Sequence, residues 1–196
     1  MKYIFYGLGI LILSLGISLT IQSGLGTSPF DALLVGLSKE IGLTVGSWEV
    51  LISVILLICN AILTRKLGLI TAFITGIGID LWLFVVKNTI YLNALLSKLI
   101  CFGIGLMLIG LGTAIYLQTK FASTPIDHLT LIIRDLSKRT ILFSRTLVYA
   151  LFLVLAIIFK GPIGIGTLLT VCLGGMILHV FMPIVEKQFL SKKRRG

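Results

Sequence analysis

Apolar residues run along this chain in six long stretches separated by short polar segments. Most of these stretches hold roughly 18 to 22 residues, and a helix of that length crosses the roughly 30 Å hydrocarbon core of a bilayer. We interpret them as spans at Tyr3–Ile21, Trp48–Leu63, Leu67–Val86, Leu99–Leu117, Ile141–Phe159 and Ile163–Val185. The pattern therefore predicts an all-α polytopic membrane protein with six transmembrane helices.

Two short segments of the chain are nearly the same. Gly26–Asp31 reads GTSPFD and Ala122–Asp127 reads ASTPID, and the two proline numbers differ by 96. The same shift aligns Gly9 with Gly105 and Gly16 with Gly112. We predict a duplicated chain whose halves each hold three spans and one short amphipathic or re-entrant helix. Because three is odd, the halves enter the membrane from opposite sides and form inverted repeats.

The expected organisation is one transmembrane domain covering residues 1–196. Repeat 1 covers about residues 3–88, repeat 2 about residues 99–185, and a basic cytoplasmic tail follows at 186–196.

Composition and charge agree with insertion into a bilayer. Hydrophobic residues make up 57% of the chain, charged residues 12%, and the mean hydropathy is +1.12. The formal charge of +10 comes from cations in loops and the tail, which favours anionic lipid headgroups and excludes nucleic acid as the expected partner. We expect the chain to lie in the cytoplasmic membrane with both termini on the cytoplasmic side. Four of the 17 Lys and Arg residues then lie outside: Lys39, Lys87, Lys98 and Lys160.

An eight-span arrangement satisfies the charge rule equally well. In it the segments after Asp31 and Asp127 also cross, and the halves are parallel. Length favours six spans, because a helix from Pro29 to Ile41 rises only about 20 Å and its last turn holds Lys39 and Glu40. Arg65 and Lys66 lie inside with six spans and outside with eight.

The duplicated motif has the residues of a helix start. Ser28 is a suitable N-cap, Pro29 fits the first helical position, and Asp31 can complete a capping box; Thr124–Asp127 repeats these roles. In one interpretation the helix lies at the interface and the carboxylate only caps it. In the other, the approach Ser23–Gly26 dips inward and the helix starts at membrane depth, where its free N–H groups and a carboxylate bind an anion, a proton or a cation.

Other polar residues extend the candidate substrate or ion site. Gln22 and Gln118, at the ends of the preceding spans, offer amides to the two motifs. Asp80 lies well inside the third span, where a carboxylate is costly, and is the strongest single candidate. His179 lies at a similar depth in the sixth span, and an imidazole can carry protons.

Two charged residues and four glycines have structural interpretations. Glu49 and Arg145 lie in the first turns of their spans, and we expect them to extend to the headgroups. In the alternative they face the bundle, where Arg145 can pair with a carboxylate such as Asp127. Gly9 and Gly16, like Gly105 and Gly112, are seven residues apart on one helix face, which predicts close backbone approach at a helix crossing or a dimer contact.

Several of these motifs also resemble one family. Gly24–Asp31, Gly46-Ser47-Trp48, Arg65–Gly68 and Gly76–Asp80 are similar to segments of the YczE/YyaS/YitT family of bacterial integral membrane proteins. The resemblance covers nearly the whole chain. It implies a polytopic membrane protein, for which a transport role is a common suggestion.

The leading functional hypothesis is a small secondary transporter or permease component that moves a small molecule or ion through a site at the repeat interface. The alternative is a membrane scaffold or regulatory partner that does not transport. A homodimer or another membrane protein stays open as a partner. We expect no enzyme activity, cofactor or metal site, because the chain has no paired His and Glu at metal spacing and no nucleophile elbow.

Overall fold

The computed structural model describes residues 2–61, 68–119, 121 and 124–193. Within these ranges the secondary structure is entirely helical. The helices are α1 (Lys2–Ser23), α2 (Pro29–Glu40), α3 (Val45–Ala61), α4 (Gly68–Thr89), α5 (Leu95–Gln118), α6 (Pro125–Ser137), α7 (Ile141–Ile158) and α8 (Ile165–Lys193). Among them α1, α4, α5 and α8 are long and apolar enough to cross a membrane. The helices α3 and α7 are also apolar, over shorter stretches. The predicted all-α membrane fold is confirmed at this level.

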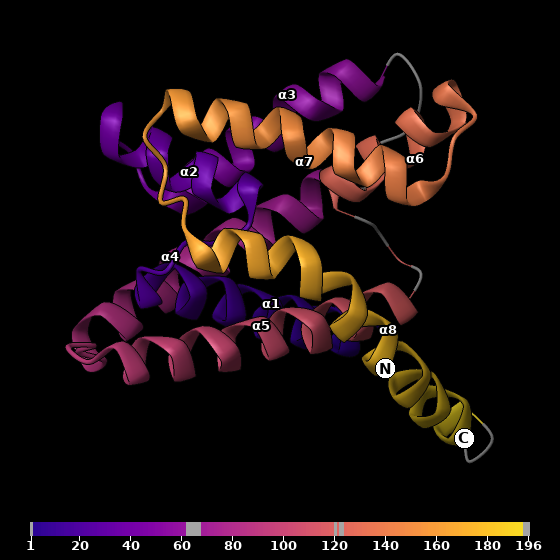
Figure 1. The fold of residues 1–196 in the computed structure, drawn as a ribbon. Coiled ribbons are helices and arrows are strands. Elements are labelled where there is room, and N and C mark those ends of the chain that lie inside the picture. The colour runs from indigo at the N-terminus through magenta and orange to yellow at the C-terminus, as the bar shows by residue number, and fades with distance from the viewer. Residues whose placement is uncertain (1, 62–67, 120, 122–123, 194–196) are drawn as a thin grey trace.

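The helices form two layers (Figure 1). In the lower layer of that view α4 packs on α1, α1 on α5, and α5 on α8. In the upper layer α2 packs on α7 and α3, and α6 packs on α7 and α3. Contacts between α3 and α4 join the layers. The main core cluster lies between them, with Ile10 of α1, Leu34 of α2 and Val148 of α7 all fully buried.

Glycines set the closest contact in the lower layer, between α1 and α5. A Cβ on Gly9 would lie 3.1 Å from the carbonyl oxygen of Gly112, and a Cβ on Gly16 would lie 2.7 Å from that of Gly105. The predicted close backbone approach is therefore confirmed, and it occurs between these two helices. As the residue number rises along α1 it falls along α5, so the two helices are antiparallel.

The two short helices differ in their surroundings. On α6, Ile126 and Ile133 pack against the core while Arg134 bonds exposed Asp135, which gives the helix one apolar and one polar face. On α2, every residue from Pro29 to Leu37 is buried, on all sides of the helix. The interpretation of α2 as a helix lying on the membrane surface is therefore wrong, because α3 and α7 cover it.

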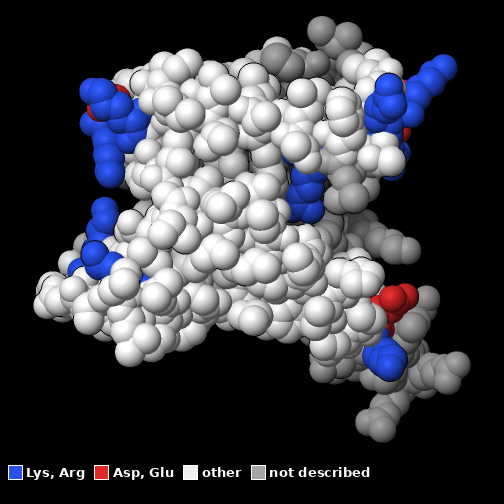
Figure 2. Space-filling model, viewed as in Figure 1, with Lys and Arg blue, Asp and Glu red and all other residues white. Residues whose placement is uncertain are grey.

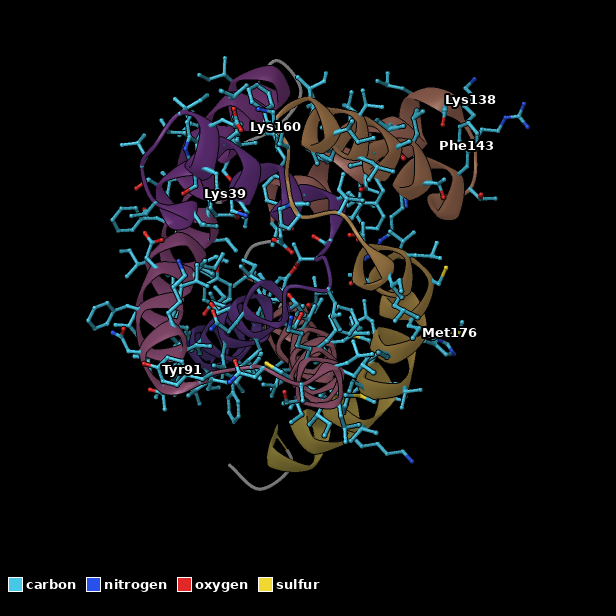
Figure 3. The ribbon with its side chains drawn as sticks, turned by 60° about the vertical axis from the view of Figure 1, so that its left-hand side comes forward. Lys39, Tyr91, Lys138, Phe143, Lys160 and Met176 are labelled. Atoms are coloured by element: carbon cyan, nitrogen blue, oxygen red, sulfur yellow. The ribbon has the colours of Figure 1, made fainter. Side chains whose placement is uncertain are left out.

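Charged side chains gather at opposite ends of the molecule. Figure 2 shows blue atoms at both ends of the view, with one further blue group inside the broad, otherwise white band between them. Lys39 and Lys160 lie on one side of Figure 3 and Lys138 on the other. Nζ of Lys160 is 3.2 Å from Oε1 of Glu40, so the end of α2 and the end of α7 meet at the same edge. Both labelled termini lie at the opposite end (Figure 1).

Candidate functional site

The start of α2 follows the local chemistry that its residues favour. Ser28 is the N-cap, and its Oγ accepts a hydrogen bond from the backbone N–H of Asp31 at 3.2 Å. Pro29 occupies the first helical position, where its missing N–H costs nothing. The Ser28 hydroxyl also donates to Oδ2 of Asp31 at 2.6 Å, and Thr27 donates to the same oxygen at 3.5 Å. The predicted N-cap is confirmed, with the carboxylate bonded to hydroxyls.

This helix begins beside the middle of α7. Pro29 lines one cavity together with Tyr149 and Leu153, and the Phe30 ring packs edge-on against Phe152 with centroids 5.0 Å apart. Further along, Gly36 reaches the carbonyl oxygen of Phe159, just past the end of α7. At 1.5 Å per residue, the seven residues from Pro29 to Gly36 place the start of α2 about 10 Å from that end of α7. The Ser28 cap lies inside the helix bundle.

The segment before Ser28 finds hydrogen-bond partners inside the protein. Gly24 and Gly26 have φ values of 68° and 101°, a region that favours glycine. The carbonyl of Leu25 accepts the N–H of Gly166, at 2.8 Å, from the first turn of α8. The Thr27 hydroxyl lies 3.0 Å from the Thr20 hydroxyl of α1. Irregular backbone inside a membrane protein requires such internal partners.

Glu49 is the residue that sequence reasoning misplaced. We expected its side chain to extend to the headgroups, but only 5% of it is exposed. The helix α2 packs on α3, and the Glu49 side chain is enclosed. It lies within electrostatic reach of Asp31, which is 6% exposed. In the described part of the chain Glu49 makes no hydrogen bond or ion pair. We call Asp31 and Glu49 the carboxyl pair.

Ser53 extends the polar surface beside this pair. It follows Glu49 by four residues, so the two side chains lie one turn apart on the same face of α3. Ser53 is 1% exposed, and its hydroxyl has no hydrogen-bond partner among the described residues. Buried polar atoms without partners are rare in proteins and call for an explanation. The spacing of Glu49 and Ser53 was visible in the sequence, but the helix that covers them was not.

Asp80 has a different role from the one expected. Its Oδ1 accepts the backbone N–H of Gly46 at 2.8 Å, and its Oδ2 accepts the Thr44 hydroxyl at 2.6 Å. The carboxylate thus caps the start of α3 from α4. Gly46 and Gly76 permit this approach, because a Cβ on Gly76 would lie 2.6 Å from the carbonyl oxygen of Gly46. Asp80 is engaged in holding α3 against α4, and we do not include it in the candidate site.

The other predicted site residues are dispersed. Gln22 donates to the carbonyl of Ile90 at 3.1 Å, not to Ser28. Gln118 is half-buried at the end of α5, and Thr124 is half-buried directly before α6. His179 is exposed on α8. The side chain of Asp127 lies outside the described residues, as do Arg65 and Lys66.

A cavity of about 310 Å³ separates α7 from α8 beside the start of α2. Pro29 forms one wall, and Tyr149 and Val171 belong to the facing helices. Nη2 of Arg145 donates to the Tyr149 hydroxyl at 2.9 Å, which keeps the guanidinium near this cavity. By contrast, α3 and α4 pack together. The residues 96 positions after Gly46, Gly76 and Asp80 are Leu142, Cys172 and Met176.

These features define a helical membrane protein with a short buried helix that starts beside a carboxyl pair. Comparison with known proteins agrees with this class. Residues 1–183 match a family of unknown function, DUF6198. The chain belongs to this family, and the resemblance to YczE and YyaS proteins is confirmed.

Three relatives illustrate the similarity. The uncharacterized protein YyaS of Bacillus subtilis strain 168 is 93% identical over 200 residues, covering all of both chains. The uncharacterized membrane protein YczE of the same strain is 33% identical over 188 residues, which is 93% of this chain and 86% of that protein. An uncharacterized protein of Haemophilus influenzae is 29% identical over 177 residues, covering 90% of this chain and 81% of the relative. No solved structure matches the chain.

Proposed function

We propose that the protein is a small secondary transporter or permease component that moves a small molecule or ion across the cytoplasmic membrane. The observation that carries this proposal is the start of α2, where a capped helix end and the Asp31 carboxyl lie inside the bundle. Helix starts and carboxylates at this depth are costly in a membrane, and they commonly mark substrate or ion sites. A scaffold that only packs against partners has no need of them.

The architecture we propose is a pair of inverted repeats with six spans. Pro29 and Pro125, which start α2 and α6, differ by 96, and so do Val45 and Ile141, which start α3 and α7. The same shift relates Gly9 to Gly105 and Gly16 to Gly112. The contact of Gly9 with Gly112 therefore has its equivalent in the contact of Gly105 with Gly16. Two contacts that are exchanged in this way are expected of two halves related by a two-fold axis.

Helix direction supports six spans over eight. An eight-span chain carries its first and fifth helices across the membrane in the same direction. Six spans carry them in opposite directions, in agreement with the antiparallel contact of α1 and α5. Lys39 and Lys160 at one end, with both chain termini at the other, agree with cytoplasmic termini under the positive-inside rule.

The test is transport by purified protein in liposomes. Currents are recorded on a solid-supported membrane while a panel of small metabolites is applied under a proton or sodium gradient. We expect at least one compound to evoke a current that Asp31→Asn abolishes and that Asp135→Asn, a change at an exposed carboxylate, leaves intact. The absence of any current, with stable co-purification of another membrane protein, would support the scaffold alternative instead.

A further inference from the structure

The carboxyl pair has no cation to balance it among the described side chains. Both carboxyls are more than nine-tenths buried, and Glu49 has neither a hydrogen bond nor an ion pair in the described part of the chain. Two ionised carboxylates so placed repel each other and lose hydration. Adding one proton removes most of this cost, because the pair then holds a single negative charge and an O–H donor.

We propose that Asp31 and Glu49 form a proton-binding site that holds one exchangeable proton. On binding, a carboxylate oxygen of the pair forms an O–H bond, and an acid dissolved in the water loses its proton. As the coupling site of the transporter, this assignment rests on the proposed function; as a proton site, it rests on the burial of both carboxyls, their electrostatic interaction and the lack of a balancing cation among the described side chains.

The environment of each carboxyl decides where the proton resides. Asp31 accepts hydrogen bonds from the Ser28 and Thr27 hydroxyls and lies in the first turn of α2, where the helix dipole favours negative charge. Glu49 has none of these partners. The negative charge therefore stays on Asp31 and the proton on Glu49, where its O–H is one helical turn from Ser53.

Charged groups on the neighbouring helices are engaged elsewhere or are exposed. Asp80 of α4 is bonded to Gly46 and Thr44, and Arg145 of α7 is bonded to Tyr149. On α6, Arg134 bonds Asp135 at the surface, and the side chains of Asp127 and His128 lie outside the described residues. On α2 itself, Lys39 and Glu40 are exposed.

The second half does not repeat the pair. The residue 96 positions after Glu49 is Arg145, a permanent cation, whereas Asp127 takes the place of Asp31. A matching acid pair therefore occurs in the first half alone. This asymmetry is expected if one of two related helix starts has been specialised for proton binding.

The test is infrared difference spectroscopy of the full chain in lipid, with pH steps across the neutral range and sodium-free buffer. We expect a protonated-carboxyl band that disappears as pH rises, that is lost in Glu49→Gln, and that remains in the matched surface control Asp135→Asn. Asp31→Asn should keep the band but move its disappearance to lower pH. In this variant the amide carries no charge, so no neighbouring carboxylate opposes the ionisation of Glu49. Only the burial of Glu49 still opposes its ionisation.

Several results would overturn the assignment. A band that persists unchanged in Glu49→Gln places the proton elsewhere. No titrating band in the neutral range means that the pair does not exchange protons there. If sodium chloride, in place of choline chloride, moves the titration to lower pH, the site binds monovalent cations rather than a proton alone. A titrating pair in a protein without transport currents would instead sink the proposed function and leave the proton site standing.

Discussion

Gly16 of α1 and Gly105 of α5 approach so closely that a Cβ on Gly16 would lie 2.7 Å from the carbonyl oxygen of Gly105. The obstructing atom is backbone, which cannot rotate away as a side chain would. The contact therefore fixes the distance between the two helices at this crossing.

Gly16→Ala is expected to destabilise the protein by about 1–3 kcal/mol, because the two backbones must separate. The matched control is Gly103→Ala, also on this helix pair, where an added Cβ meets nothing within 4 Å. Since Ala favours helix over Gly by up to about 1 kcal/mol, Gly103→Ala should leave stability unchanged or raise it. Thermal unfolding in detergent measures both variants. Equal stability of the two would contradict the tight crossing.

Ser28→Ala removes the N-cap of α2 and one of the two hydroxyls bonded to Asp31. We expect a loss of about 1 kcal/mol, the usual cost of a missing serine cap, and a larger loss if the carboxylate is left poorly bonded. Ser137→Ala, at an exposed serine at the end of α6, is the control and should change little. Denaturant unfolding in mixed micelles compares them. A Ser28→Ala protein as stable as the control would mean that the cap contributes nothing.

Asp80→Ala removes the acceptors for the Gly46 N–H and the Thr44 hydroxyl. The Thr44 hydroxyl still accepts the N–H of Ser47, but the start of α3 loses its hydrogen bonds to α4, and we expect a loss of about 1–3 kcal/mol in thermal stability. Asp80→Asn keeps one acceptor oxygen and should lose less. Because Asp80 is assigned to packing, any transport current should survive Asp80→Asn in protein that remains folded. A current abolished by Asp80→Asn at normal stability would return Asp80 to the site.

The features that could be predicted from sequence are the local ones. Ser28, Pro29 and Asp31 act on backbone groups within a single helical turn, so their pattern is enough to locate the start of α2. The long apolar runs likewise predict the positions of the long helices. These signals do not depend on how the rest of the chain folds.

The site itself depends on contacts between distant segments. Asp80 and Gly46 are 34 residues apart, and no local pattern indicates that the carboxylate of one caps the helix of the other. Glu49 looked like a residue near a span end, because the chain does not reveal that α2 folds across it. Burial of a first-turn residue is decided by its neighbours in space, and these were missing from the sequence pattern.

The proposed architecture requires that the two halves enter the membrane from opposite sides. The most direct measurement is labelling of intact cells with a membrane-impermeant maleimide, using chains whose three cysteines are replaced by alanine. Lys39→Cys reports the exposed end of α2, and Arg139→Cys the exposed segment after α6. We predict that Cys at position 39 is labelled from outside, while Cys at position 139 is labelled only after the cells are opened. Labelling of both positions from the same side would contradict inverted repeats.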